Sequence, residues 1–305
     1  DALIECRTHH SACRRIHADS ADNADIGAIA EGIAKQREFQ EAYGTTRPYQ
    51  LGLALSGGSI KGFAHLGILK YLDEVGLRPE IIAGTSAGSI MGAFYASGYA
   101  PEEVHELLSQ TGFMQMTSFT TKGGGIFSTT KFLNLLKKNL RHRKLEDLPT
   151  PMRIVATDLN RGEPHVFTEG PLAKIILASS SIPILFCPVE IDGHTYVDGG
   201  LFRNFPVTAI REDCEEVIGM NLGPVQSAEI PMNIKDIANR AWELIFRQNT
   251  TPDCAACDYL LETSEVMKFG MFEVSASEQL MKIGYELAKS ELAPLVKKKK
   301  DAKKP

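Results

Sequence analysis

From Gln50 to Leu222 the chain alternates short apolar runs with segments whose apolar residues recur at helical spacing. The apolar runs predict strands at 50–55, 80–84, 153–159 and 216–222. The helical spacing predicts helices at 60–76, 87–98, 101–110, 129–140 and 171–181. Strands that alternate with helices of this length predict an α/β fold of three layers (α/β/α), in which helices cover both faces of a mainly parallel sheet.

The pattern weakens on either side of this main domain, 50–222. Residues 1–47 are polar and carry mixed charge, which predicts a partly helical N-terminal appendage. Residues 223–296 predict a helical extension of the main domain, with helices near 233–249 and 276–292. The lysine run at 297–305 predicts a solvated, disordered tail, with attachment to anionic lipid as the alternative.

One internal segment, 111–128, has no clear period and contains three consecutive glycines, Gly123–Gly125. It predicts a loop with scattered apolar side chains. Two interpretations stay open, a lid over a binding site and a plain surface connection.

Composition narrows the class of protein. The chain has 305 residues, of which 43% are hydrophobic, and a net charge of −5, so it can bury a large core and does not resemble a basic nucleic-acid binder. No apolar run approaches the roughly 20 residues that span a bilayer. These features favour a soluble, cytoplasmic or peripheral membrane protein. The first residue is Asp1 rather than methionine, which keeps a processed, exported form open.

Six cysteines are too few for a disulfide framework in a chain of this length. Cys254 and Cys257 form one CAAC sequence, and a zinc site that pairs them with Cys6 and Cys13 would have to join opposite ends of the chain. Structural zinc sites usually have compact ligand spacing, so we expect unpaired thiols and no metal.

The sequence GTSAG at 84–88 sets one serine among small residues, between a predicted strand and a predicted helix. A tight strand-to-helix turn needs small residues two positions to either side, and Gly84 and Gly88 occupy these positions. Such a turn lifts the hydroxyl off the sheet, beside the N–H of Ala87 at the positive end of the helix. The pattern therefore predicts a nucleophile elbow that carries Ser86.

A second glycine-rich turn, in LALSGGSIKGFAHLG, also joins a strand to a helix. Gly57 and Gly58 leave the backbone free to direct N–H groups toward an anion. The dinucleotide fingerprint would need glycine at the position of Ser59. A Walker A loop would need glycine directly before lysine, whereas here Lys61 precedes Gly62. Since the same sheet carries the predicted elbow, we interpret this loop, together with the N–H of the elbow helix, as an oxyanion hole.

The proton acceptor for the serine is less evident. The histidines that follow it are His105, His142, His165 and His194. None of them lies in a glycine-punctuated loop with an obvious upstream acidic partner. Asp192 and Gly193 predict a two-residue hairpin turn, which leads into Asp198, Gly199 and Gly200. On spacing alone Asp198 is either the general base or a residue that caps its own turn.

SGGSIKG, GTSAG and DGG, in this order, resemble the three motifs of patatin-like phospholipases. The stretches ATDL, ASSSIPILFCPV and DGGLFRNFPV also match, and the resemblance covers 50–222. It implies a serine–aspartate acyl hydrolase without a catalytic histidine, with Ser86 as nucleophile and Asp198 as base.

The resemblance also implies roles for the surrounding residues. The glycine loop, with Gly57, Gly58 and Lys61, would belong to the oxyanion hole, and Asn204 and Pro206 would shape the turn after the aspartate. The chain departs from the family at Ser59, where a third glycine is usual. If this position needs a positive φ, the serine strains the loop.

The expected function is that of a lipid acyl hydrolase of the phospholipase A or lysophospholipase type, working through an acyl-enzyme and without a metal, nucleotide or other cofactor. The expected partner is a lipid or another acyl ester; peripheral membrane contact stays open, and no nucleic acid is expected. One alternative is a non-catalytic lipid-binding scaffold, which Ser59 would permit. The other is a dinucleotide-binding oxidoreductase, which Ser59 and the lack of an acidic residue at the end of the second strand disfavour.

Overall fold

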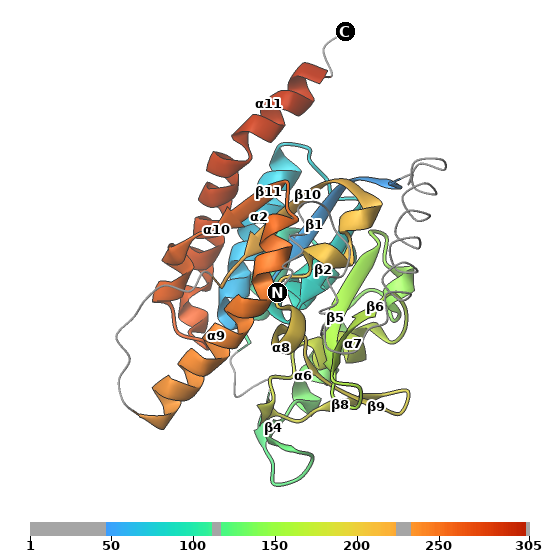
Figure 1. The fold of residues 1–305 in the computed structure, drawn as a ribbon, viewed down its shortest axis with the longest axis vertical. Coiled ribbons are helices and arrows are strands. Elements are labelled where there is room, and N and C mark those ends of the chain that lie inside the picture. The colour runs from blue at the N-terminus through green and yellow to red at the C-terminus, as the bar shows by residue number, and fades with distance from the viewer. Residues whose placement is uncertain (1–46, 112–116, 224–232, 303–305) are drawn as a thin grey trace, which may run out of the picture. The chain divides into compact units, whose positions relative to one another are not determined.

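The structure, a computed structural model, describes residues 47–111, 117–223 and 233–302, all within one unit, Arg47–Pro305 (Figure 1). The appendage predicted over 1–47 therefore lies almost entirely outside the described residues, as do Cys6 and Cys13. No described helix is long and apolar enough to cross a membrane.

The strands are β1 (Tyr49–Leu55), β2 (Ile81–Thr85), β3 (Ser118–Phe119), β4 (Gly125–Ser128), β5 (Met152–Asp158), β6 (Glu163–Phe167), β7 (Ile184–Phe186), β8 (Val189–Ile191), β9 (His194–Asp198), β10 (Cys214–Asn221) and β11 (Tyr259–Glu262). The α-helices are α2 (Phe63–Glu74), α3 (Ala87–Ala96), α4 (Pro101–Ser109), α6 (Thr130–Asn139), α7 (Leu172–Ser179), α8 (Gly200–Arg203), α9 (Ile234–Ala255), α10 (Ser277–Glu291) and α11 (Ala293–Ala302). Six short 3₁₀ helices complete the described elements: η1 (Ser59–Gly62), η2 (Leu145–Asp147), η3 (Val207–Ala209), η4 (Arg211–Asp213), η5 (Ser264–Lys268) and η6 (Val274–Ala276).

A central sheet of eight strands organises the fold, in the order β11-β10-β1-β2-β5-β9-β8, with β6 paired to β5. The strands from β11 to β5 are parallel to one another, whereas β6, β8 and β9 join by antiparallel pairing. All the predicted strands and helices of the main domain are present. The predicted α/β fold with a mainly parallel sheet is confirmed.

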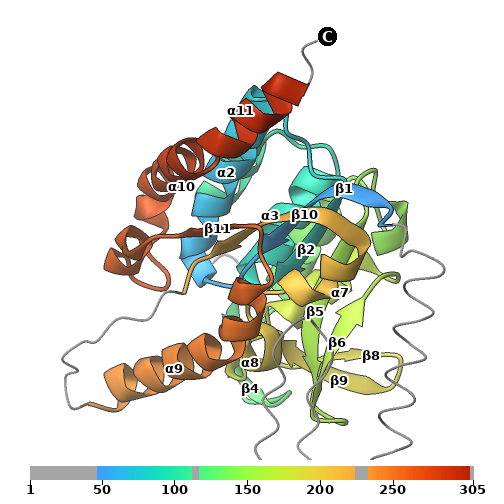
Figure 2. The same cartoon turned by 45° about the horizontal axis from the view of Figure 1, so that its top comes forward.

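Side chains that alternate along the strands supply two cores, one on each face of the sheet. Leu53 of β1 and Ile82 of β2 belong to the larger core, which α2, α3 and α10 cover (Figure 2). Ala54 and Ala83, their neighbours in sequence, belong to a smaller core under the segment that follows α8. Because both faces are buried, these strands read as apolar runs without alternation, as is typical of parallel sheets.

The segment predicted as a loop at 111–128 contains two short strands. β3 and β4 pair as an antiparallel hairpin, and β4 pairs in parallel with β7, which makes a separate three-stranded sheet. The prediction of a loop is therefore wrong for β3 and β4. Strands of two to four residues are too short to produce a period that can be recognised. Residues 112–116 lie outside the described part of the chain.

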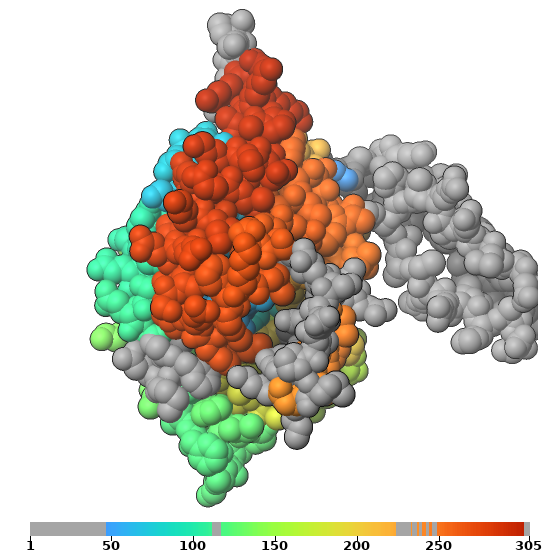
Figure 3. Space-filling model, turned by 90° about the vertical axis from the view of Figure 1, so that its left-hand side faces the viewer, coloured from blue at the N-terminus to red at the C-terminus, as the bar shows by residue number. Residues whose placement is uncertain are grey.

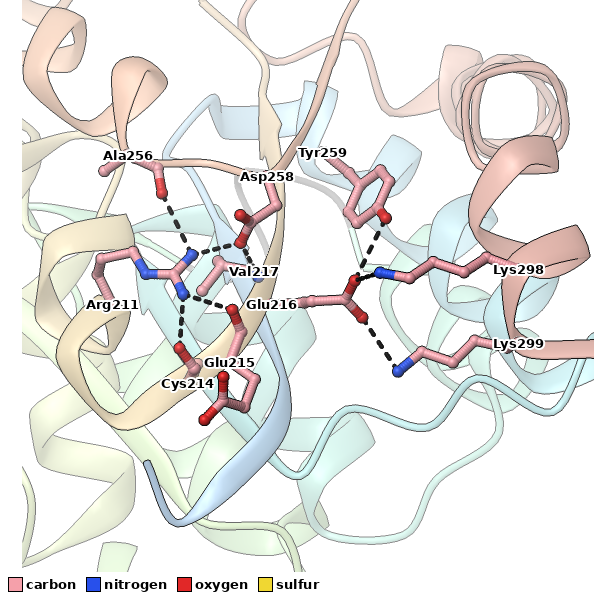
Figure 4. Close-up of polar contacts among 10 residues, drawn as sticks. All are labelled: Arg211, Cys214, Glu215, Glu216, Val217, Ala256, Asp258, Tyr259, Lys298 and Lys299. Atoms are coloured by element: carbon pink, nitrogen blue, oxygen red, sulfur yellow. Dashed lines mark hydrogen bonds and ion pairs between the residues drawn. The ribbon is translucent and has the colours of Figure 1, made fainter. Parts of the chain in front are cut away.

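The C-terminal region also differs from the prediction. β11 was not predicted, and it extends the central sheet beside β10. α9 runs to Ala255, beyond the predicted end near 249. The buried Arg211 ties the residue before β11 to β10, because its guanidinium donates to the carbonyl oxygens of Cys214 and Glu215 and pairs with the Asp258 carboxylate (Figure 4).

The prediction of a disordered lysine tail is wrong as far as Ala302, where α11 ends. Lys298 and Lys299 of this helix place their Nζ atoms 2.6 Å and 3.0 Å from the two carboxylate oxygens of Glu216 (Figure 4). Leu295 on the same helix is fully buried. A mostly buried carboxylate and an apolar anchor thus hold a segment whose composition alone suggests a solvated tail.

Candidate active site

Ser86 and Asp198 meet because two strands share one edge of β5. β2 occupies the first part of this edge and ends with Thr85 opposite Val155. β9 takes over at the next residue, with Asp198 opposite Ala156. The residue after Thr85 therefore faces Asp198, and the Ser86 Oγ donates a hydrogen bond of 2.6 Å to the Asp198 Oδ2.

Ser86 has the backbone of a nucleophile elbow. Its φ of 51° and ψ of −120° lie in a region that few non-glycine residues occupy. The turn is so tight that a Cβ atom on Gly88 would lie 2.1 Å from the Leu55 carbonyl oxygen, and one on Gly84 would lie 2.7 Å from the Gly88 carbonyl oxygen. Both glycines are therefore sterically required, as the sequence predicts.

Contacts with both its carboxylate and its backbone fix the position of Asp198. Its Oδ1 accepts a hydrogen bond of 2.7 Å from the Gly200 N–H. The Thr157 hydroxyl donates to its carbonyl oxygen. Gly199 passes so close to β5 that a Cβ would lie 2.3 Å from the Val155 carbonyl oxygen. Burial raises the pKa of Asp198 to about 6, although the hydrogen bonds from Ser86 and Gly200 oppose this change. The carboxylate is then ionised at neutral pH and more basic than an exposed aspartate.

The glycine-rich loop supplies fewer donors than the sequence suggests. The Gly57 N–H donates to the Asn204 carbonyl oxygen (2.9 Å), and the Lys61 N–H donates to the Gly58 carbonyl oxygen (3.1 Å). These two N–H groups are therefore bonded within the fold, so Gly57 and Lys61 belong to the predicted oxyanion loop without offering a free backbone donor. The Lys61 side chain points to the Met267 sulfur, at 3.3 Å.

Three N–H groups remain near the serine for an incoming oxygen atom. Within the described residues, the backbone N–H groups of Gly58, Ser59 and Ala87 have no acceptor. Ser59, Ser86 and Ala87 line one cavity. Gly62 brings the loop against the elbow helix, since a Cβ there would lie 2.7 Å from the Ala87 Cβ.

Ser59 has a φ of 52°, so the position that departs from the family motif does adopt the left-handed conformation. A serine there carries a conformational cost of about 1 kcal/mol or more that glycine would avoid. Its N–H is retained, so the loop keeps its donor geometry.

His65 is a residue that the sequence analysis did not single out. It is fully buried on α2, and its Nε2 lies 2.8 Å from the Ser56 carbonyl oxygen, which requires the Nε2–H tautomer. Burial lowers its pKa to about 4, so the ring is neutral under ordinary conditions. It supports the loop one residue before Gly57. Its position on the apolar side of the predicted helix is the signal that could have identified it as a buried residue.

Within the described part of the chain, none of the four histidines considered as bases is a hydrogen-bond partner of the Ser86 hydroxyl or the Asp198 carboxylate. His194 does have an acidic partner, since its Nδ1 lies 2.8 Å from the Asp158 Oδ2, but Asp158 pairs with Tyr196, toward the other end of β9 from Asp198. His165 packs its ring against Phe167. Among the described residues, the Asp198 carboxylate is bonded to the Ser86 hydroxyl and the Gly200 N–H.

Comparison with known proteins identifies the family of this chain. A family model described as patatin-like phospholipase matches residues 53–210, about half of the chain, which include the elbow, the glycine loop and Asp198. The chain belongs to the patatin-like phospholipase family.

Relatives of the chain share this region. An uncharacterized NTE family protein of Mycobacterium tuberculosis is 32% identical over 194 residues, which cover 61% of this chain and 54% of the relative. Lysophospholipase NTE1 of Kluyveromyces lactis is 29% identical over 221 residues, covering 70% of this chain and 15% of the relative. The chain thus spans about half of the first and a small part of the second. The crystal structure of VipD from Legionella pneumophila shares the fold, with a TM-score of 0.50 and 13% identity over 82% of this chain and 67% of that chain.

A cavity of about 150 Å³ opens beside Ser86. Most of its lining is apolar: Ile60, Phe63, Ile90, Met91, Leu108, Phe132, Ile182, Phe186, Met271, Phe272 and Val274. The last three lie beyond the region that the patatin-like phospholipase model matches. The Ile60 N–H donates to the Met271 carbonyl oxygen (3.3 Å), which ties this C-terminal wall to the glycine loop.

The described residues contain no group of three or more histidine, cysteine or acidic side chains that could hold a metal ion. Cys254 and Cys257 are unpaired thiols, and burial raises the pKa of both.

Proposed function

We propose that this protein hydrolyses the acyl ester bonds of lipids, as a serine esterase of the phospholipase A or lysophospholipase type. The observation that carries the proposal is the hydrogen bond of 2.6 Å between the Ser86 hydroxyl and the buried Asp198 carboxylate, at the mouth of an apolar cavity. The name of the Kluyveromyces lactis relative is that of a lysophospholipase, which agrees with this substrate class.

In the first half-reaction, the Ser86 Oγ attacks the carbonyl carbon of the ester while its proton passes to the Asp198 Oδ2. The negative charge on the carbonyl oxygen is stabilised by the backbone N–H groups of Gly58, Ser59 and Ala87. The bond from the carbonyl carbon to the alcohol oxygen then breaks, the alcohol takes the proton from Asp198, and an acyl-enzyme remains.

In the second half-reaction, a water molecule gives its proton to Asp198 and attacks the acyl carbon. The bond to the Ser86 Oγ breaks, the serine regains the proton, and a fatty acid leaves. Every step uses a hydroxyl, a carboxylate and backbone N–H groups, so the proposed mechanism requires no cofactor.

The raised pKa of Asp198 suits this role. A carboxylate with an ordinary pKa is a weak base at neutral pH, whereas a pKa of about 6 brings its basicity closer to that of histidine. The apolar cavity would hold the acyl chain, and the described residues that line it include no charged side chain that would bind a nucleotide.

The test combines active-site labelling with product analysis. A fluorophosphonate reacts with an activated serine, so we expect labelling of the parent protein and none of Ser86→Ala. Ser290→Ala is the matched control, because this exposed serine on α10 also lies near a carboxylate, that of Glu291, and its loss should leave labelling intact. Mass spectrometry of mixed phospholipids and lysophospholipids incubated with the protein identifies the bond cleaved. A folded Ser86→Ala protein that still releases fatty acid would refute the assignment.

A further inference from the structure

The three-stranded sheet of β3, β4 and β7 exposes large apolar side chains. Phe119 is 71% exposed, Ile184 is 70% exposed and Ile126 is 44% exposed. The hairpin of β3 and β4 projects from the described part of the molecule, near the label of β4 in Figure 1 and at the lower, green end in Figure 3. Exposed side chains of this kind, gathered on one element, are typical of an interaction surface.

The small sheet is continuous with the cavity beside Ser86. Phe119 lies opposite Phe127, and Phe127 lies opposite Phe186, so the pairing places all three on one face of the sheet. The rings of Phe119 and Phe127 pack edge to face, with their centroids 6.4 Å apart. Phe186 lines the cavity. A row of aromatic side chains thus leads from the outer surface to the cavity wall.

Ile184 is held outward against its conformational preference. Its φ of 72° is in the left-handed region, where a β-branched residue is a rare outlier. A strained backbone that exposes a large apolar side chain lowers stability and gains no packing. Such strain is found where a surrounding structure maintains it for binding.

The charge of the small sheet also distinguishes it from the rest of the chain. Residues 117–128 and 181–189 contain one charged residue, Lys122, in a protein whose net charge is −5. Acidic side chains, which anionic lipid would repel, do not occur in these two segments.

We infer that the sheet of β3, β4 and β7 docks on a lipid surface, with Phe119 and Ile184 entering the acyl layer. Lys122 then lies at the level of the headgroups, and a lipid chain passes along Phe127 and Phe186 toward Ser86. The choice of a lipid over a protein partner rests on the proposed function, because the row of side chains ends at Phe186, which lines the proposed acyl site.

Vesicle binding tests this inference separately from catalysis. All proteins carry Ser86→Ala, so that no lipid is consumed, and binding to phosphatidylcholine vesicles with and without phosphatidylglycerol is measured by flotation. The test variant is Phe119→Ser with Ile184→Asn, since asparagine tolerates a positive φ. We expect at least about a tenfold loss of vesicle affinity, from two apolar side chains removed from the lipid. The loss should occur on both kinds of vesicle, and phosphatidylglycerol should strengthen binding of the parent.

The control is Leu159→Ser, which removes an apolar side chain that is 47% exposed and lies outside the small sheet. It should bind vesicles as the parent does. With Ser86 restored in both proteins, the double variant should hydrolyse a soluble short-chain ester at the rate of the protein without the two substitutions, which shows that the fold and the dyad are intact.

Three outcomes would overturn the inference: a parent that does not bind vesicles, a double variant that binds as well as the parent, and an equal loss in the Leu159→Ser control. Sedimentation of the parent as a dimer and of the double variant as a monomer would also overturn it, in favour of contact between two copies. Failure of the ester assay in the protein with Ser86 restored and no other substitution would instead refute the proposed function, whatever the vesicles show.

Discussion

The Gly57 N–H donates to the Asn204 carbonyl oxygen over 2.9 Å, and this bond joins the glycine loop to the turn that follows Asp198. The approach is so close that a Cβ on Gly57 would lie 2.4 Å from the Asn204 Oδ1 and 3.1 Å from the Ser86 Cβ. This contact between segments far apart in the sequence therefore contributes to fixing the backbone donors relative to the two reacting side chains.

Gly57→Ala should disturb this contact without removing any reacting group. We expect kcat/KM for a soluble ester to fall by about 10²-fold, the effect of a displacement of roughly 1 Å at a reacting centre. Asn204→Ala in the same protein should recover part of the loss, because the Oδ1 that the new methyl group strikes is then absent. Full activity of Gly57→Ala would show that the loop adapts and does not determine the geometry.

Ser59→Gly should stabilise the protein by up to about 1 kcal/mol, since it relieves the left-handed strain at the expense of some added freedom in the unfolded chain. Activity should be unchanged or higher, as the N–H donor is kept. Urea unfolding and ester kinetics measure the two effects. Ser180→Gly is the control, because Ser180 lines the same cavity with a negative φ and should lose stability. Lower stability of Ser59→Gly would mean that the serine side chain stabilises the loop.

Asp198→Asn should abolish catalysis and increase stability at high pH. The folded pKa of about 6 lies above the ordinary value of 3.8, so the native state binds more protons than the unfolded state between these values. Stability from this group therefore declines as the pH rises from about 4 to about 6, and the ionised form costs of the order of 3 kcal/mol above that range. Asparagine carries no charge and can still accept from Gly200.

Urea unfolding at pH 8 and pH 4 tests this difference. The variant should exceed the parent in stability at pH 8 and match it at pH 4. His65 titrates in a similar range, but it does so in both proteins and cancels from the comparison. A variant that is less stable than the parent at pH 8 would indicate that Asp198 acts chiefly as a cap of its own turn.

The pH dependence of kcat/KM should show a limb near the Asp198 pKa of about 6, with activity rising as the carboxylate ionises. A histidine base would give a limb close to this value, so single substitutions decide between the two. Glutamine in place of His105, His142, His165 or His194 should leave the limb and most of the activity in place. If one of these four histidine variants folded but had a kcat/KM lower by several orders of magnitude, a catalytic triad with that histidine would be established.

Glu216→Gln should loosen α11, because the helix loses the carboxylate that pairs with Lys298 and Lys299. Hydrogen exchange of the amides of α11 should accelerate, while labelling of Ser86 is unaffected. Glu215→Gln changes the neighbouring exposed carboxylate and should leave exchange as it is in the parent. Unchanged exchange in both variants would mean that the buried Leu295 alone holds the helix.

The elbow could be predicted from sequence because its determinants are local. Gly84, Ser86 and Gly88 lie within five residues between a strand and a helix, and steric limits on such a turn leave few alternatives. Asp198 was different, since its spacing alone allowed two interpretations and the family resemblance favoured one. Its place beside Ser86 depends on β9 taking over the edge of β5 where β2 ends, a tertiary pairing that no local pattern encodes.

The misassigned segments share one physical cause. Whether the Gly57 N–H is free or bonded depends on Asn204, which is far away in the sequence. The helical state of the lysine run depends on Glu216 in β10. β3, β4 and β7 stabilise one another only once they pair. Contacts of long sequence separation decide the first two cases and the pairing of β4 with β7, and composition and periodicity do not record them.

Met271, Phe272 and Val274 stand outside the stretch that carries the elbow, the glycine loop and Asp198, yet they close the cavity. The residues of the proposed chemistry and one wall of the proposed acyl cavity thus lie in separate segments of the polypeptide. Exchanging these three wall residues for those of a relative could change which acyl chains the cavity accepts, while Ser86, Asp198 and the glycine loop stay the same.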